Sequence, residues 1–223
     1  MSFYSDKFIK YSLIFLSMES GIVVYKKIVP GVTVDETILK CLVLYGDKLY
    51  TDLNSRDSES RESARNALKI EEMLANHSED FLPERFKRKE YSRLKAVYAF
   101  PFEFPEEWCY PNLVPLDRCF TDGETVIKMV VDGSSALVLP MCEVDSFYYS
   151  DEDYTGNQRA MKRVRTYWES AVSLGEFDRD FVNPNKRGYE WYSRDGTARI
   201  EKPEVIIPEW NLEKVSFVNI SLD

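Results

Sequence analysis

Two stretches of the chain place their hydrophobic residues at helical spacing. In residues 59–77 and again in 157–172, apolar positions recur every three or four residues, so each stretch predicts an amphipathic helix with one face in the core. The apolar positions are Ala64, Ala67, Leu68, Ile70, Met73 and Leu74 in the first stretch, and Ala160, Val164, Tyr167, Trp168 and Ala171 in the second. A shorter helix is predicted over 33–45, opened by Thr33 and closed by Gly46.

Short runs of β-branched and aromatic residues predict the strands. These runs occupy 8–15, 22–29, 92–100, 125–131, 136–139, 204–207 and 214–222. The segment 176–197 is dense in Asn, Gly, Asp and aromatic residues and predicts a loop, while Pro105 suits the first turn of a short helix reaching Trp108. Six or more short strands with two main helices predict an α+β fold, and the length allows a single domain over 1–223.

The composition is that of a folded, acidic protein. Hydrophobic residues make up 44% of the chain and aromatic residues 14%, which excludes a disordered chain. The formal net charge of -9 argues against binding to nucleic acid mainly through phosphate neutralisation. The four cysteines lack the close spacing of zinc sites or dense disulfide frameworks, which favours reduced thiols and a cytoplasmic location. Without a leader-like N-terminus or an apolar run near the roughly 20 residues of a membrane span, we expect no membrane partner.

A carboxylate opens one of the most apolar predicted strands. Glu204 follows Pro203 and leads directly into Val-Ile-Ile. Charged residues are almost never fully buried unless they are paired, so a glutamate in this place indicates either a partner or a function. Two further pairs offer chemistry, namely Ser92-Arg93 at the start of a predicted strand and Tyr167-Trp168 on the second predicted helix.

Several common chemistries find little support. A nucleophilic triad would have to use His77, the single histidine, which lies in a polar stretch typical of a solvated helix end. Neither a GxGxxG nor a GxxxxGK[ST] phosphate-binding loop is present. The one dense acidic run, 151–153, is more typical of a solvated loop than of a cation site, so we predict no metal centre.

Six short segments, taken in order, carry a resemblance to a known family. They are Tyr91-Ser92-Arg93-Leu94, Val97-Tyr98-Ala99-Phe100, Glu106-Glu107-Trp108, Val126-Ile127-Lys128, Arg165-Thr166-Tyr167-Trp168 and Pro203-Glu204-Val205-Ile206-Ile207. Together they resemble the ADP-ribosyltransferase-like domains, and specifically a family of small bacterial domains of unassigned activity. The resemblance spans most of the chain and rests on order and spacing, because each motif alone is short. It implies a split β-sheet core with two main helices.

The resemblance also implies a chemistry in which NAD is a substrate. Cleavage of nicotinamide from NAD develops positive charge on the ribose, and Glu204 would hydrogen-bond the ribose hydroxyls and stabilise that charge. Tyr167, the second implied catalytic residue, would stack on the nicotinamide ring. Arg93, or Arg85 nearby, would pair with the pyrophosphate through the guanidinium fork.

The remaining cofactor-binding residues that the resemblance implies are Ser92, Trp168, Tyr11 and Ser12. Related enzymes usually carry a histidine or arginine on the first strand, where this chain has the stretch containing Tyr11 and Ser12. Lys202 stands two positions before the glutamate, where arginine-modifying relatives have an acidic residue. This difference favours a nucleobase or another acceptor over arginine.

The acceptor of ADP-ribose would be a macromolecule, either nucleic acid or protein. The basic segment 85–89 would lead a nucleic-acid strand to the site, whereas the overall acidity favours a protein target. The biological setting that the resemblance implies is a toxin, a phage-defence protein or a counter-defence protein. An antitoxin or inhibitor protein is a further expected partner.

A second interpretation stays open, in which a catalytically inactive domain of the same fold binds another protein. Exposed aromatic residues in 147–149 and 189–192 would then anchor the interface. In this interpretation Tyr167 and Trp168 are core residues, Arg93 is an ion-pair partner, and Glu204 is structural. The two interpretations differ in geometry, because the enzyme requires Glu204, Arg93 and Tyr167 to meet at one cleft.

Overall fold

Three antiparallel sheets and five α-helices make up the described part of the chain. The structure is a computed structural model, and it describes residues 21–87, 90–101, 123–149, 154, 157–185, 188–193, 199–201, 203–218 and 220. The helices are α1 (Val34–Cys41), α2 (Tyr45–Leu53), α3 (Ser58–Asn76), α4 (Ser78–Phe81) and α5 (Gln158–Glu169), with 3-10 turns η2 (Met141–Glu143), η3 (Asp145–Tyr149) and η4 (Glu209–Lys214). The mixture of helices and antiparallel sheets confirms the predicted α+β class.

Each sheet has a simple strand order. The first sheet has the order β1-β3-β10, the second β2-β9-β4-β5 and the third β6-β7-β8. The strands of the first sheet are β1 (Gly21–Ile28), β3 (Thr125–Asp132) and β10 (Ser216–Phe217). Those of the second are β2 (Ala96–Ala99), β9 (Pro203–Pro208), β4 (Leu137–Pro140) and β5 (Val172–Ser173), and those of the third are β6 (Phe177–Asn185), β7 (Gly188–Ser193) and β8 (Arg199–Glu201).

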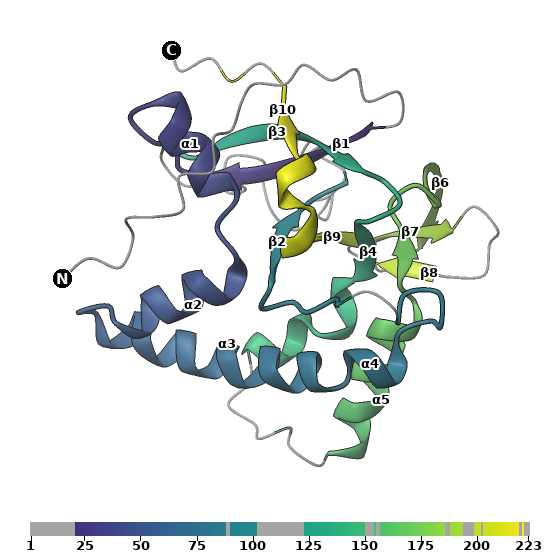
Figure 1. The fold of residues 1–223 in the computed structure, drawn as a ribbon. Helices are drawn as coiled ribbons and strands as arrows, with labels where there is room; N and C mark the ends of the chain where they lie inside the picture. Colours follow the sequence, from purple (N-terminus) through teal and green to yellow (C-terminus); the bar gives the residue numbers. More distant parts are fainter. Residues whose placement is uncertain are drawn as a thin grey trace.

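The second sheet is the middle layer of the molecule. Figure 1 shows the first sheet above it and helices α2 to α5 below it. Successive side chains of a strand point to opposite faces, so Val205 and Ile207 of β9 join the core against the first sheet, while Ile206 joins the core against the helices. All six residues of β9 are buried, as expected for a strand that is covered on both faces. Glu204 lies on the same face of β9 as Ile206, and its side chain therefore faces the helices.

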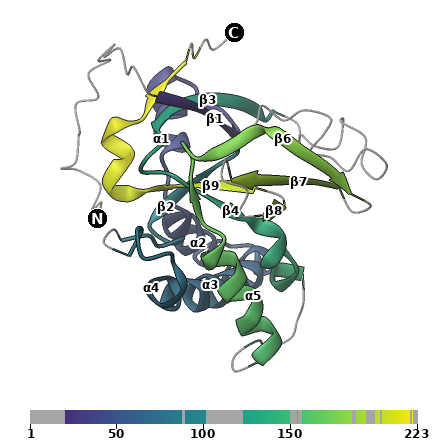
Figure 2. The same ribbon diagram turned by 90° about the vertical axis from the view of Figure 1, so that its right-hand side faces the viewer.

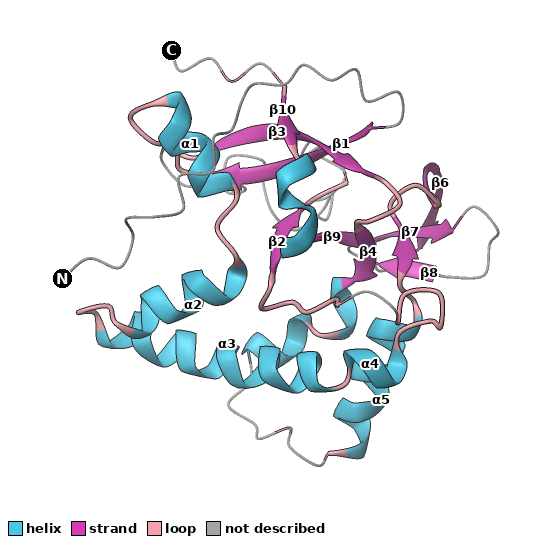
Figure 3. Ribbon diagram, viewed as in Figure 1, coloured by secondary structure: helices cyan, strands magenta, loops and turns pink. Residues whose placement is uncertain are grey.

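The two long predicted helices are confirmed. Helix α3 begins one residue before the predicted range and ends one residue inside it, and it buries Ala64, Ala67, Ile70 and Leu74 on one face. Helix α5 begins one residue after Asn157, whose side chain accepts hydrogen bonds from the backbone of Arg159 (2.9 Å) and Ala160 (3.3 Å). Figure 3 shows α2 to α5 together on one side of the sheets, with α1 apart from them beside the first sheet.

The shorter predicted helix begins as expected but ends early. Thr33 caps α1 through a capping box with Glu36, and α1 then ends at Cys41. Gly46 does not terminate it, because Gly46 lies in the first turn of a second helix, α2, that the sequence pattern did not predict. The backbone of Gly46 lies against Leu94, because its N–H donates to Leu94 O at 3.0 Å. A glycine is required there, since a Cβ would lie only 2.7 Å from that oxygen.

The loop predicted over 176–197 is wrong. Strands β6 and β7 pair with each other through most of this segment, and Figure 2 shows them as two long strands side by side. The pairing of Asn185 with Gly188 joins the two strands as a hairpin. Backbone hydrogen bonds hold the two strands together here. Such bonds do not require an alternation of apolar and polar side chains, which is the pattern that predicts strands from sequence.

The predicted C-terminal strand is confirmed over a short stretch. Among the described residues of 214–222, Ser216–Phe217 form β10, while Lys214 is the last residue of η4. The predicted elements at 8–15 and around Pro105 lie outside the described residues. No helix within the described ranges is both long and apolar enough to cross a membrane.

Candidate functional site

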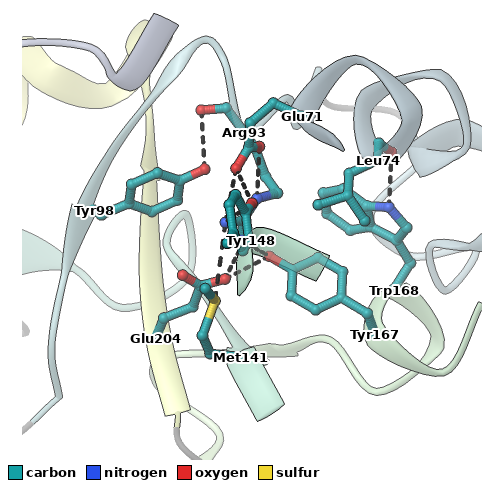
Figure 4. A network of polar contacts seen from close by, with 9 residues as sticks. All are labelled: Glu71, Leu74, Arg93, Tyr98, Met141, Tyr148, Tyr167, Trp168 and Glu204. Atoms are coloured by element: carbon teal, nitrogen blue, oxygen red, sulfur yellow. Dashed lines mark hydrogen bonds and ion pairs between the residues drawn. The ribbon is translucent and has the colours of Figure 1, made fainter. Parts of the chain in front are cut away.

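Arg93 lies buried between two carboxylates that come from neighbouring layers of the fold, the helices and the middle sheet. Its Nε donates to Glu71 Oε2 at 2.8 Å, and its Nη2 donates to Glu71 Oε1 at 3.1 Å. Its Nη1 donates to Glu204 Oε1. Only 2% of Arg93, 0% of Glu71 and 6% of Glu204 is exposed. Figure 4 shows the three side chains converging from the segment before β2, from α3 and from β9.

Three tyrosines complete this arrangement, which we call the Arg93 network. Tyr167 of α5 accepts from Arg93 Nη1 and donates to Glu204 Oε1 at 2.7 Å. Tyr148 of η3 accepts from Arg93 Nη2 at 3.3 Å and donates to Glu71 Oε1. Tyr98 of β2 places its ring 4.8 Å from the guanidinium carbon and donates to the Arg93 carbonyl at 3.3 Å.

The guanidinium of Arg93 therefore has no donor left for a ligand. A guanidinium carries five N–H groups. Nε bonds Glu71, Nη1 bonds Glu204 and Tyr167, and Nη2 bonds Glu71 and Tyr148. In this structure Arg93 links α3, η3, α5 and β9 through hydrogen bonds from one guanidinium.

The network holds more negative than positive charge, because one guanidinium faces two carboxylates. Burial raises the pKa of Glu204, and the charge of Glu71 adds to this effect, whereas Arg93 and the Tyr167 hydrogen bond oppose it. Burial likewise raises the pKa values of Tyr167, Tyr148 and Tyr98, so the phenols act as neutral hydrogen-bond donors.

One oxygen of Glu204 differs from the rest of the network. Oε1 accepts hydrogen bonds from Arg93 and Tyr167, whereas none of the described residues donates to Oε2. Figure 4 shows Oε2 pointing away from Tyr167, on the side of Tyr98. This oxygen is the part of the network that can accept a hydrogen bond from a ligand hydroxyl.

The structure brings together three of the residues predicted from the sequence, namely Glu204, Arg93 and Tyr167. Trp168 lies next to the network but points towards α3, where its Nε1 donates to Leu74 O at 2.9 Å. Both Tyr167 and Trp168 are fully buried core residues, so neither ring offers a face to a cofactor in this structure.

The other predicted site residues do not join the network. Ser92 is half-buried, and within the described part of the chain its hydroxyl makes no recorded hydrogen bond. Arg85 forms an exposed ion pair with Glu176 at 2.7 Å and stacks on Phe86. Tyr11 and Ser12 lie outside the described residues.

The sequence interpretation missed Glu71, Tyr148, Tyr98 and Met141, whose Sδ lies 4.0 Å from Arg93 Nη2. A signal for Glu71 was present. It stands four residues after Ala67 and three before Leu74, in the apolar stripe of α3, where a carboxylate requires a partner. No comparable signal marks Tyr148. The aromatic segment 147–149 was expected to be exposed, but Phe147 packs in the core and Tyr148 belongs to the network.

A second feature that bears on function is a group of exposed apolar side chains close in the sequence to α1. Among the described residues, seven large hydrophobic side chains are exposed, and six of them lie within 29–50. Five of the six lie on α1 or beside it in the sequence, and we call these five the α1 surface: Val29, Val32, Val34, Leu39 and Val43. Single exposed hydrophobic residues are normal, but such a concentration in one segment is typical of an interaction site.

The structure gives no indication of a metal centre in the ranges it describes, where no group of three or more His, Cys, Asp or Glu side chains could hold an ion. Comparisons of the chain with protein-family models, with curated proteins and with solved structures each found no match. The ADP-ribosyltransferase-like family therefore stays a prediction from the sequence.

Proposed function

We propose that this protein is a protein-binding module that docks through the α1 surface. The observation that carries the proposal is the concentration of exposed apolar side chains in 29–50, with Val32 88% and Leu39 56% exposed. Interfaces gain most of their energy from a few apolar or aromatic anchors that become buried on binding. The Arg93 network differs from such a surface, because its polar groups are already hydrogen-bonded to one another.

In this proposal the Arg93 network is an internal anchor. It joins the helical layer to the middle sheet through charge-assisted hydrogen bonds from one guanidinium. Buried ionic groups of this kind serve conformational specificity in some proteins, and here they would hold the scaffold from which α1 is presented. The residues that were expected to contact NAD would then be structural.

Changing two exposed side chains of the α1 surface tests the proposal. We expect a variant with Val32→Ser and Leu39→Ser to lose at least about 2 kcal/mol of binding energy, or roughly 30-fold in affinity, because truncating anchors at an interface costs this much. The measurement is affinity capture from cells that naturally contain the protein, followed by titration of the captured protein against both forms.

The matched control carries Arg65→Ser and Lys69→Ser on the exposed face of α3. It should retain the partner as the wild type does. Equal retention by all three forms, with each form folded, would contradict docking through the α1 surface.

ADP-ribosyl transfer is a second candidate, and Glu204 Oε2 is the observation that favours it. A carboxylate whose other oxygen is held by Arg93 and Tyr167 is well oriented to hydrogen-bond a ribose hydroxyl and to stabilise the positive charge of nicotinamide cleavage. Because Glu204 is buried, NAD would have to open the network, and Tyr98 and Tyr148 are the members that are only half-buried. With this candidate function we also propose the split-sheet core of the ADP-ribosyltransferase-like domains, a nucleic-acid or protein acceptor, and an inhibitor protein as partner.

A Glu204→Gln variant tests this second candidate. Incubation with labelled NAD and cell lysate should give label transfer by the wild type, and transfer by the variant should fall at least about 100-fold because the stabilising charge is lost. Glu209→Gln is the matched control, since Glu209 is exposed just beyond the other end of β9. Failure of the wild type to bind NAD or transfer label would leave only the binding module.

A further inference from the structure

Two consecutive lysines of β1 lie in opposite surroundings. Lys27 Nζ lies 2.6 Å from Glu124 Oε2, so this ammonium has a counter-ion. Lys26 lies on the other face of the strand, the face of the fully buried Val24, because successive side chains of a strand alternate. Its partner across the ladder is Ile127, which belongs to the same core. Lys26 is therefore a lysine on the core-facing side of the first sheet.

No counter-ion meets the Lys26 amine among the residues that the structure describes, where no hydrogen bond or ion pair holds it. The titratable groups that act on it are the thiol of Cys41, at the end of α1, and the ammonium of Lys48, on α2. Neither is a carboxylate. Cys41 is fully buried, and burial raises the pKa of its thiol to about 11, so the thiol is protonated at neutral pH.

An amine in these surroundings is more stable without its charge. Burying an ammonium that has no partner costs far more than burying a neutral amine. Burial lowers the pKa of Lys26 to about 8, with Cys41 opposing this effect and the charge of Lys48 adding to it. At pH 7 about one tenth of the amine is then uncharged, roughly 200 times the fraction for an ordinary lysine. The uncharged form carries the lone pair of a nucleophile.

The surroundings of this amine also indicate what it can bind. Lys26 is half-buried, so it keeps part of its surface in contact with solvent. Lys48 is exposed, and its ammonium bonds none of the described residues. The structure thus combines a nucleophilic amine on the core side of β1 with an available cation on α2. The cation is complementary to an anionic group on whatever reacts with the amine.

We propose that Lys26 captures an aldehyde that carries an anionic group, forming an imine with the aldehyde carbon while Lys48 pairs with the anion. The amine nitrogen adds to the carbonyl carbon to give a carbinolamine. Loss of water then forms the C=N bond, and the water takes the carbonyl oxygen and both amine hydrogens. The step needs no oxidant or reductant. It goes beyond the proposed function, because Lys26 belongs neither to the Arg93 network nor to the α1 surface.

Reductive trapping on the full chain tests the proposal. The first probe is para-carboxybenzaldehyde, which is an anionic aldehyde. The second is para-formylbenzamide, a neutral aldehyde of nearly the same shape. Each probe is incubated with the protein at neutral pH and with cyanoborohydride, which reduces an imine to a stable secondary amine. Mass spectrometry of peptides then gives the extent of labelling at each lysine.

We expect the anionic probe to label Lys26 at least about tenfold more than Lys27, a smaller ratio than that of the uncharged forms because a less basic amine is a weaker nucleophile. Labelling of Lys26 should rise with pH to a midpoint of about 8. Both lysines are compared within the wild type, so this result does not depend on the folding of a variant. Lys26→Met should remove the label, and Lys27→Met is the matched control that should keep it. Equal labelling of the two lysines in the wild type would overturn the proposal.

The anionic group of the ligand has its own test. At low salt the carboxylate probe should label Lys26 at least about threefold faster than the amide probe, because Lys48 attracts the anion. Lys48→Met should bring the two rates together, and it is expected to fold because Lys48 is exposed. Equal rates for the two probes in the wild type would refute an anionic aldehyde as the ligand. A preference that survives in Lys48→Met would refute the role of Lys48.

Discussion

Replacing Arg93 by leucine is expected to lower the free energy of unfolding by about 3–5 kcal/mol at neutral pH, which is the usual cost of removing one partner from a buried ion pair. Glu71 and Glu204 would remain buried without a counter-ion, and the Tyr167 and Tyr148 hydroxyls would lose a donor. Leucine is smaller than arginine, so a packing defect would add to the loss. Urea denaturation of both forms measures the difference.

The loss should depend on pH in a specific direction. Without Arg93, Glu204 can become neutral in the buried site only by binding a proton, so the stability of the leucine variant should approach that of the wild type as the pH falls. Arg85→Leu is the matched control, because Arg85 is half-exposed and its pair with Glu176 should contribute no more than about 1 kcal/mol. An Arg93 variant no less stable than the Arg85 variant would contradict the anchoring role.

Glu71 and Glu204 are expected to respond very differently to the same substitution. Glu71→Gln should cost about 3 kcal/mol, because glutamine would place an amide N–H against the guanidinium that Glu71 now binds with both oxygens. Glu204→Gln should cost less than about 1 kcal/mol. Its carbonyl can still accept from Arg93 and Tyr167 through one oxygen, and the excess negative charge of the network disappears.

The pH dependence distinguishes the two carboxylates further. The pKa of Glu204 is raised in the folded protein above its ordinary value of 4.5. As pH rises from that value through the raised one, the unfolded chain loses the Glu204 proton before the folded protein does. Stability therefore falls across this window, and the Glu204→Gln variant should lack this part of the fall. Parallel stability curves for wild type and variant between pH 4 and 8 would refute the assignment.

Local sequence patterns predicted the elements whose cause is local. Helices α3 and α5 follow from apolar spacing and from capping side chains such as Asn157, which act over a few residues. The apolar run after Pro203 likewise predicted β9. Strands β6 and β7 were missed because a hairpin can be held by backbone pairing alone, without an apolar alternation to mark it. Helix α2 was missed because Gly46 resembles a helix stop, although its lack of a side chain serves contact with Leu94.

The candidate site shows the same division between local and distant causes. The sequence by itself determined that Glu204 needs a partner, because it opens a buried strand, and it carried an equivalent signal at Glu71 in the stripe of α3. Only the tertiary structure decided that both meet Arg93, which lies 22 residues after one and 111 residues before the other. These residues meet because of the face of β9 on which Glu204 lies and because of how the helices pack on the middle sheet. Neither can be read from a few neighbouring residues. Which apolar residues remain exposed at α1 was decided in the same way, since exposure depends on what the rest of the fold covers.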